Sequence, residues 1–275
     1  MKTSIQNIIK MIENEDVFTA TAEDGSFTIK IEKYIPYFSI AIHAGHHFRD
    51  SLIDNCLLSE YDRRYEEDPK TDTFIENQSI TMIAHDSRYE YDLNRDINAC
   101  VYETAWGKTI WKKPLSSIEI EKSHKKYHNF YTVAYALIRK LEGKFSFCEI
   151  FNMHSYNYKR HDRTTPLFDM ATDYLNHDIF GERLTQFQIL LSQISIDGIE
   201  NITTQNNVFT GGGNFLKSVT CDFSNTLVYA FEVKKIYCNE LSGKLHPKLI
   251  KQLTDKIDKA INHQIRERNP KLISY

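Results

Sequence analysis

The chain has 275 residues, a formal net charge of −3 and 26% charged residues of both signs. This length suits one larger α/β domain or two small ones, and the weakly acidic balance predicts neither nucleic acid nor a membrane surface as a partner. The first thirty residues lack the pattern of a leader, and no apolar run approaches the ~20 residues that span a bilayer, so we expect a cytoplasmic protein.

Two elements are predicted near the beginning of the chain. Residues 3–14 carry four isoleucines at helical spacing, and we expect this helix to lie outside the catalytic core. Residues 26–32 alternate between apolar and polar side chains, which indicates an outer strand. Residues 1–37 are therefore treated as an N-terminal extension whose packing the sequence leaves open.

Residues 38–49, FSIAIHAGHHFR, join an apolar run to a turn rich in histidine. The run is bounded by Pro36 and predicts a buried strand of a mixed or parallel sheet. His43, His46 and His47 follow it at once, at the sheet edge where α/β proteins hold ligands. Our hypothesis is that His43 binds a catalytic zinc ion, and the alternative is that these are loop histidines on a wet surface.

The next hundred residues alternate between helices, strands and a charged segment. Residues 51–61 predict a short helix, and DRRYEEDPKTDT at 62–73 reads as a solvated surface segment in which Pro69 prevents a continuous helix. Residues 79–84 predict a strand. The clearest helix spans 116–143, with a capping box at its start and a glycine at its end. Its two histidines stand four apart without a third ligand, so we expect no second metal site there.

The second half of the chain predicts two more strands and a closing helix. FSFCEIFNM at 145–153 reads as a central strand that ends on His154, and 227–236 reads as a strand that carries Glu232 in an apolar setting. Residues 156–180 are polar and predict an active-site loop. The chain ends in a helix that begins at Pro247.

Strands therefore alternate with helices along the chain, and no internal repeat or flexible linker interrupts them. We predict an α/β fold in which a central mixed sheet is flanked by helices, with residues 1–275 as one domain. The glycines at 211–213 form a turn that lacks the lysine and spacing of a phosphate-binding loop, so nucleotide binding is not predicted.

A metal site in this chain must use histidine and carboxylate ligands. The five cysteines are odd in number and scattered, which argues against disulfides and against a CxxC zinc site, and we expect buried free thiols. His43 and His154 both follow predicted strands, and one carboxylate of the acidic segment would complete a three-ligand zinc site with an open position for water. Zinc would lower the pKa of that water and polarise the scissile carbonyl.

Other side chains suit the remaining steps of amide hydrolysis. Glu232, on a late apolar strand, would carry the proton to the leaving amine, because burial raises its pKa towards the working pH. Arg88, Asn94 and Arg95 form a compact set that can hold an anionic substrate. Alternatively, the two arginines pair with nearby aspartates at the surface, and Glu232 pairs with a lysine across a strand edge.

Six motifs occur in order between residues 38 and 240. They are HAG at 43–45, EEDPKTD at 66–72, SRYEYDLNR at 87–95, KYHNFY at 126–131, NMHSY at 152–156 and AFEVKKIYCNE at 230–240. This set resembles the N-formylglutamate amidohydrolases, which are related in fold to the zinc carboxypeptidases and to phosphorylase/hydrolase-like proteins. The arginine-rich SRYEYDLNR motif together with the HS dipeptide is the most specific part of the resemblance.

The resemblance implies a role for each matching residue. His43, Asp68 and His154 would bind Zn²⁺, although the related carboxypeptidases take their second ligand at the place of His46. Arg88 would polarise the carbonyl and Glu232 would act as the general base. Asn94 and Arg95 would bind a substrate carboxylate, and we add His46 and Arg163 as further substrate contacts.

The implied activity is zinc-dependent hydrolysis of an N-acyl acidic amino acid such as N-formylglutamate. The histidine-rich turn and the segment after His154 depart from the family pattern, so the reaction type transfers better than the substrate. Two alternatives remain open: a carboxypeptidase-like metallopeptidase that acts on a peptide C-terminus, and a non-catalytic ligand-binding homologue. The partner is in each case a small molecule or a short peptide, and the oligomeric state is not predicted.

Overall fold

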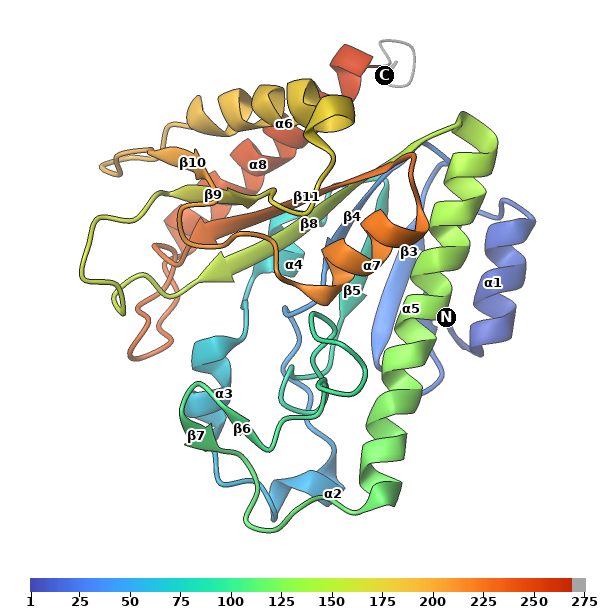
Figure 1. Cartoon of the computed structure of the whole chain (residues 1–275), viewed down its shortest axis with the longest axis vertical. Coiled ribbons are helices and arrows are strands. Elements are labelled where there is room, and N and C mark those ends of the chain that lie inside the picture. The colour runs from blue at the N-terminus through green and yellow to red at the C-terminus, as the bar shows by residue number, and fades with distance from the viewer. Residues whose placement is uncertain (269–275) are drawn as a thin grey trace.

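The computed structural model describes residues 1–268, and within them the chain builds a nine-stranded mixed sheet (Figure 1). The central strands β5, β4, β8 and β11 run parallel, and antiparallel strands flank them on both sides. Across the sheet the strands are β1 (Lys2–Thr3), β2 (Phe18–Ala22), β3 (Phe27–Ile31), β5 (Ile80–Ala84), β4 (Tyr37–Ala41), β8 (Cys148–Tyr156), β11 (Thr226–Lys234), β9 (Phe168–Ala171) and β10 (Thr203–Gln205).

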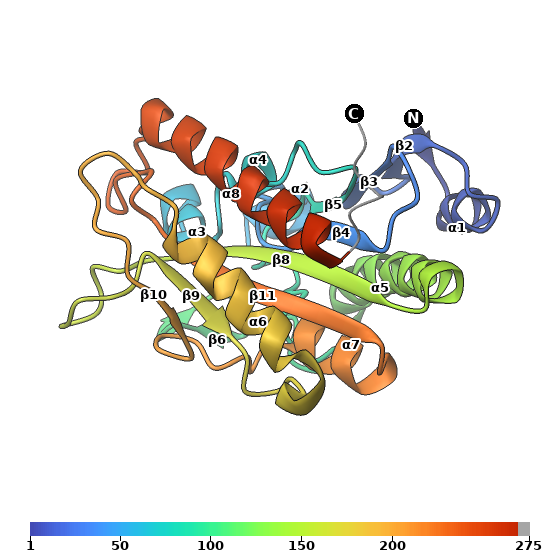
Figure 2. The same ribbon diagram turned by 90° about the horizontal axis from the view of Figure 1, so that it is seen from above.

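Helices cover both faces of this sheet. In Figure 2, α8 lies on one side of β8 and α7 on the other. The buried rings of Phe151 on β8 and Tyr229 on β11 stack with centroids 4.8 Å apart beneath the helices. The helices are α1 (Ile5–Glu13), α2 (Asp50–Ile53), α3 (Glu60–Glu66), α4 (Thr71–Phe74), α5 (Ser117–Phe145), α6 (His177–Ser192), α7 (Asn214–Asp222) and α8 (Pro247–Arg268). The predicted α/β class with a central mixed sheet is confirmed.

Most of the longer predicted elements are present with small shifts of their ends. The helix expected at 116–143 is α5, and the Ser116 hydroxyl accepts a hydrogen bond from the backbone N–H of Glu119 at its start. The strand expected at 145–153 is β8, but it continues through His154, which therefore lies within the strand rather than after it. The five cysteines are free, as expected, although Cys221 is exposed rather than buried.

The N-terminal residues are part of the sheet. The strand expected at the outer edge is β3, but β2 and β1 extend the sheet beyond it, so β3 is an interior strand. The sequence of β2, FTATA, has small side chains and gives little apolar alternation. Helix α1 packs against α5.

Two predictions about irregular segments were wrong. The helix expected at 51–61 ends at Ile53, while the charged segment after it contains α3, whose start is closed by a capping box between Ser59 and Asp62. The loop expected at 156–180 contains the strand β9 and the start of α6. A strand of four residues is too short to show a pattern, and its pairing with β11 supplies its hydrogen bonds instead.

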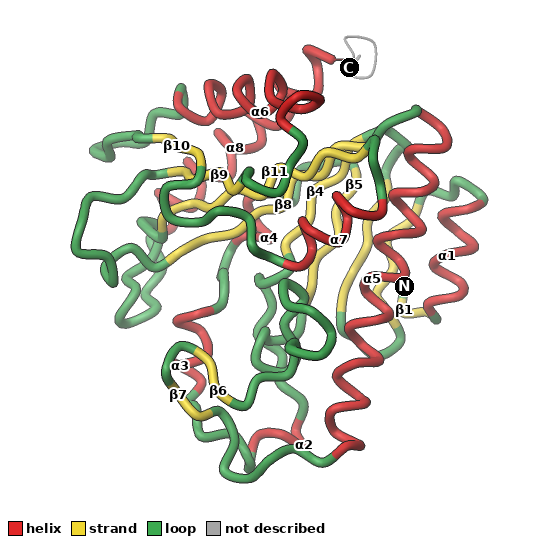
Figure 3. The backbone as a smooth tube through the Cα atoms, in the orientation of Figure 1, coloured by secondary structure: helices red, strands yellow, loops and turns green. Residues whose placement is uncertain are grey.

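Residues 42–70 and 85–115, which come before α4 and after β5, form a lobe below the carboxyl edge of the parallel strands. Figure 3 shows that this lobe consists mostly of loops, with α2, α3 and the short hairpin β6 (Thr104–Ala105) and β7 (Lys108–Thr109). It has a small apolar cluster of its own around Leu52 and Trp111. No helix in the described residues combines the length and apolarity needed to cross a membrane.

Candidate metal centre and active-site cavity

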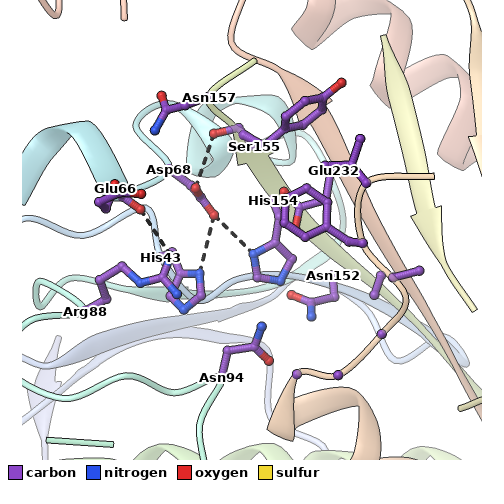
Figure 4. Close-up of a pocket in the computed structure, with 18 of the residues that line it drawn as sticks. His43, Glu66, Asp68, Arg88, Asn94, Asn152, His154, Ser155, Asn157 and Glu232 are labelled. Carbon is purple, nitrogen blue, oxygen red and sulfur yellow. Dashed lines mark hydrogen bonds and ion pairs between the residues drawn. The ribbon is translucent and has the colours of Figure 1, made fainter. Parts of the chain in front are cut away.

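A cavity of about 440 Å³ opens between the carboxyl edge of the sheet and this lobe. Three neighbouring parallel strands bring side chains to it: His43 follows the end of β4, His154 lies near the end of β8, and Glu232 lies on β11 directly opposite His154 (Figure 4). Because parallel strands end at one edge, residues nearly 200 positions apart meet there.

Within the described residues, His43, Asp68 and His154 form a buried group whose ligand atoms all lie within 4.8 Å of one another. The Asp68 Oδ2 atom lies 3.4 Å from Nδ1 of His43 and 3.1 Å from Nδ1 of His154. Figure 4 shows both imidazoles turned towards this carboxylate. Burial opposes ionisation of Asp68, but its contacts with the two imidazoles outweigh burial and lower its pKa.

The ring of His43 is held from its other side. Its Nε2 atom lies 2.9 Å from Oδ1 of Asp92, which is fully buried. Burial disfavours the charge of Asp92, yet the Arg88 guanidinium and His43 hold the pKa of this carboxyl well below its usual value. An ionised Asp92 accepts the Nε2 proton and leaves the Nδ1 lone pair of His43 directed at Asp68.

The turn that carries His43 is fixed by a close backbone approach. A Cβ atom at Gly45 would lie 2.2 Å from the carbonyl carbon of His85, so only glycine fits there. The backbone N–H of Asp68 donates to the carbonyl of His43 at 2.9 Å, and the buried Nζ of Lys235 donates to the carbonyl of Glu67 at 2.7 Å. These bonds fix the segment that carries Asp68 against the histidine turn.

These donors fit a zinc ion. Two imidazole nitrogens and one carboxylate are a ligand set that zinc accepts in catalytic sites. A carboxylate that orients a ligating histidine, as Asp92 orients His43, is a recurrent feature around such ions. The side chains are buried and converge from three separate segments, so little rearrangement is needed to close on a metal.

Glu232 differs from the other carboxylates of the cavity because no described residue pairs with it. Lys234 donates to the carbonyl of Thr165 and Lys235 to those of Tyr65 and Glu67, so the alternative of a lysine partner for Glu232 is not what the structure has. Burial, and then the negative charge of Asp68, raise the pKa of Glu232 well above its usual value. The carboxyl group is therefore suited to hold a proton.

Arg88, Asn94 and Arg95 also line the cavity. The Nη2 atom of Arg88 lies 2.6 Å from Asp92, so Arg88 is both ion-paired and exposed to the cavity. Arg95 is exposed, and its Nε atom contacts the Tyr102 hydroxyl at 3.5 Å. No described carboxylate pairs with Arg95, which leaves its guanidinium available to an anion.

Two predicted substrate contacts lie elsewhere. The His46 ring does not line the cavity and instead contacts the carboxylates of Glu67 and Glu60. Arg163 is likewise absent from the lining and is held by Asn207, to which it donates at 2.7 Å through Nη2. Of the two alternatives for the middle ligand, Asp68 is the one that lies between the imidazoles.

The sequence reasoning did not assign Asp92, Lys235 or Asn152 to the cavity. Asp92 lies four residues after Arg88 in the SRYEYDLNR motif, a spacing that by itself indicates only an ion pair at the surface. Asn152 precedes His154 by two residues on the same strand, which places both side chains on one face. The alternation of side chains between the two faces of a strand is therefore the sequence signal that could have placed Asn152 beside His154. The same alternation places Ala230 on the same face of β11 as Glu232.

This α/β fold brings a His, Asp, His group and a separate glutamate together at one edge of the sheet. These are the side chains that a metal-dependent hydrolase uses. Residues 35–212 match the family model described as N-formylglutamate amidohydrolase. This match covers well over half of the chain, and the chain therefore belongs to the N-formylglutamate amidohydrolase family. Its reaction class is that of an amidohydrolase.

Solved structures with the same fold include two from bacteria. The N-formylglutamate amidohydrolase from Ralstonia eutropha JMP134 gives a TM-score of 0.71 at 14% identity, covering 88% of this chain and 99% of that one. The gene product Atu2144 from Agrobacterium tumefaciens gives 0.65 at 12% identity, over 86% and 95%. No curated protein matches the chain in sequence.

Proposed function

We propose that this protein is a zinc-dependent amidohydrolase that cleaves the amide bond of an N-acyl amino acid. The observation that carries the proposal is the buried group of His43, Asp68 and His154, with Glu232 opposite His154 on the next strand. The family name suggests an N-formyl amino acid, N-formylglutamate above all, as the substrate. Hydrolysis of a linear C–N bond outside a peptide is the corresponding reaction.

In this proposal His43, Asp68 and His154 would hold the zinc ion, the two histidines through the Nδ1 atoms that face the Asp68 carboxylate. When bound, zinc lowers the pKa of water and polarises a carbonyl group. The chain supplies the rest of the chemistry. Asp92 keeps the proton of His43 on Nε2 and so maintains its Nδ1 as a ligand atom.

Glu232 would act as the general base and then as the general acid. Its raised pKa suits both steps, because the carboxylate accepts a proton from the attacking water and the resulting acid gives it to the leaving nitrogen. The position of Glu232 beside His154 supports this role. Because no residue of the described chain forms an ion pair with it, the carboxyl group is free to move a proton.

The cations of the cavity would bind and orient the substrate. Arg88 is fixed by Asp92 on one side and by the Glu66 carbonyl, and it would donate to the oxygen of the scissile carbonyl. Asn94 and Arg95 would hold the α-carboxylate, and Arg95, which has no carboxylate partner among the described residues, would supply the charge. A single anchored carboxylate fixes which amide faces Glu232.

The direct test is to measure metal content and hydrolysis on the same preparation. One zinc ion per chain and release of formate from N-formyl amino acids support the proposal. Cleavage of a C-terminal residue from short peptides, without action on N-formyl compounds, favours the carboxypeptidase-like alternative. Binding without turnover of any of these compounds favours a non-catalytic homologue.

Glu232→Gln separates metal binding from catalysis. We expect zinc to remain bound and turnover to fall by a factor of ~10³, within the range attributed to a general base and its proton transfers. Unchanged activity would remove Glu232 from the mechanism.

We also propose a cytoplasmic location, which the five free thiols support because thiols persist in a reducing compartment.

A further inference from the structure

The cavity face of β8 carries an amide side chain behind the candidate metal centre. Asn152 lies two residues before His154, and the alternation of side chains along the strand puts both on this face. In the strand register the neighbours of Asn152 are Ala230 on β11 and then Ala171 on β9, whose small side chains leave room beside the amide. Figure 4 shows Asn152 below His154, on the side towards Asn94.

The Oδ1 atom of Asn152 has no hydrogen-bond partner in the described part of the chain. The residue is 1% exposed, and a buried polar atom without a partner costs free energy, so such atoms are nearly always paired in native proteins. An amide oxygen accepts hydrogen bonds and cannot donate them. Because Asn152 lines the cavity, the missing donor can come from a molecule that is bound there.

Other acceptors that line the cavity are already engaged. The Asp68 carboxylate faces the two imidazoles, and the Glu66 carboxylate is bound by Arg160. The Oδ1 atom of Asn94 accepts from a backbone N–H of α7 at 3.4 Å. A donor on a bound molecule would have to displace one of these partners, whereas Asn152 offers its oxygen without such a loss.

Asn157 has an unpaired oxygen of the same kind in a different place. It follows the end of β8, its Oδ1 atom lacks a partner among the described residues, and its Nδ2 atom donates to the Tyr65 carbonyl at 2.6 Å. Figure 4 shows it beyond Asp68, on the side away from Asn94. A group held by Asn94 therefore lies closer to Asn152 than to Asn157.

The N–H of an N-acyl amino acid matches the place of Asn152. The amide nitrogen joins the acyl carbon to the carbon atom that bears the α-carboxylate. The proposed function puts the acyl carbonyl at Arg88 and the candidate metal centre, and the α-carboxylate at Asn94 and Arg95. The nitrogen then lies between these two anchors, and Figure 4 shows Asn152 between His154 and Asn94.

Glu232 and Asn152 would approach the nitrogen from different sides. Glu232 lies one row further along the sheet, opposite His154. Hydrolysis breaks the C–N bond, leaves the hydroxyl of water on the acyl carbon, and passes the proton taken up by Glu232 to the lone pair of the nitrogen. The N–H already present points elsewhere and needs its own acceptor, and a neutral amide oxygen serves without competing for the proton.

We propose that Oδ1 of Asn152 accepts a hydrogen bond from the N–H of the scissile amide and keeps it as the leaving amine forms. The site is then specific for secondary amides, and esters and N-alkylated amides, which lack this N–H, are poor substrates. This inference rests on the proposed function, because it takes from it the two groups that anchor the substrate.

The test compares N-formyl-L-glutamate with its ester analogue, in which an oxygen atom replaces the N–H, on the zinc-loaded protein. In Asn152→Leu, a change of similar size, kcat/KM for the amide should fall at least ~10-fold, because only the amide loses a hydrogen bond. The value for the ester should not change. The matched control Asn157→Leu removes the unpaired oxygen on the far side of Asp68 and should leave the amide-to-ester ratio at its wild-type value.

The outcomes separate this inference from the proposed function. Equal losses for both compounds in Asn152→Leu, no loss for either, or an amide-specific loss in Asn157→Leu alone overturns the role of Asn152 and leaves the amidohydrolase proposal standing. If Asn152→Leu unfolds or loses its zinc, Asn152→Ala replaces it under the same criterion.

If the wild type hydrolyses neither compound, the proposed function fails, and calorimetric binding of both compounds decides the role of Asn152. Tighter binding of the amide, lost in Asn152→Leu, supports the hydrogen bond. Equal binding, tighter binding of the ester or no binding overturns it.

Discussion

At the scale of single residues, Asp92 links the candidate metal centre to the substrate-binding cations. It accepts a hydrogen bond from His43 and a pair of them from Arg88, and it is fully buried. Asp92→Asn keeps the shape but presents a neutral amide to the imidazole, which weakens control of its tautomer. We expect zinc affinity to fall ~10–100-fold, as measured by competition with a chelating dye.

The control for this variant is Asp96→Asn, because Asp96 is exposed and its carboxylate accepts from the backbone N–H and the side-chain amide of Asn98 in a local turn. Its zinc affinity should equal that of the wild type. Equal affinities in all three proteins, with folding unchanged by circular dichroism, would show that Asp92 does not orient a ligand.

Lys235 is the second residue whose importance is visible only in three dimensions. Its buried Nζ donates to the carbonyls of Tyr65 and Glu67, next to Asp68. Lys235→Met leaves both carbonyls without this donor, which we expect to lower the free energy of unfolding by about 1–3 kcal/mol and to weaken zinc binding. The neighbouring variant Lys234→Met removes a partly exposed donor and should cost less in a urea titration; the reverse order would contradict this assignment.

The sequence predicted which residues form this site better than it predicted the hydrogen bonds and ion pairs that hold them in place. His43, His154 and Glu232 come from recognisable motifs, and the parallel strands bring them to one edge. The contacts of Asp92 with His43 and of Lys235 with the segment before Asp68 depend on which parts of the chain meet in the fold. Neither periodicity nor motif spacing predicts which parts meet.

At the scale of elements, a buried ion-pair network joins α5 to the lobe below the sheet. Lys126 of α5 lies 2.8 Å from Glu90 and 3.0 Å from Asp86, and Arg49 lies 2.8 Å from Glu90. Burial and the charge of Glu90 raise the pKa of Asp86 to about 6, against the opposing effects of Lys126 and the Tyr91 hydroxyl.

This shift predicts a pH dependence of stability. The pKa of Asp86 is higher in the folded than in the unfolded chain, so folding favours its protonated form. The associated stabilisation is complete below pH ~4 and is lost as the pH rises through ~6, with a total of about 3 kcal/mol. Asp86→Asn cannot titrate. The difference in unfolding free energy between wild type and variant should therefore change by that amount between pH 4 and 7, whereas a constant difference would contradict the shift.

The elements that the sequence predicted are those with a strong local pattern. Helix α5 has a capping residue and one apolar face, and β8 and β11 are rich in apolar and aromatic side chains. Helix α6 has 16 residues, but its sequence gives a weak helical pattern, because Gly181 is a poor helix former and the exposed Ile179 and Ile189 obscure the apolar face. Short strands such as β9 are defined by their neighbours rather than by their own residues.

At the scale of the whole molecule, one hydrophobic core extends from α1 through the sheet to α8 and includes Tyr91 and Leu93 of the lobe. Because the lobe shares this core and the ion pairs of α5, we propose that residues 1–37, the sheet and the lobe form a single folding unit. Both tryptophans, Trp106 and Trp111, lie in the lobe, so their fluorescence reports on the lobe alone. Circular dichroism at 222 nm reports mainly on the helices that cover the sheet.

The two signals should therefore follow the same urea transition, with equal midpoints and slopes. In Ile8→Ala, a truncation in α1 far from the tryptophans, both midpoints should move down together, since a buried isoleucine is worth about 2–5 kcal/mol. If only the dichroism midpoint moves, or if fluorescence changes at lower urea in the zinc-loaded wild type, the lobe unfolds separately. The cavity would then lie between two folding units rather than within one, and the geometry of His43 and Asp68 relative to His154 would depend on how those units dock.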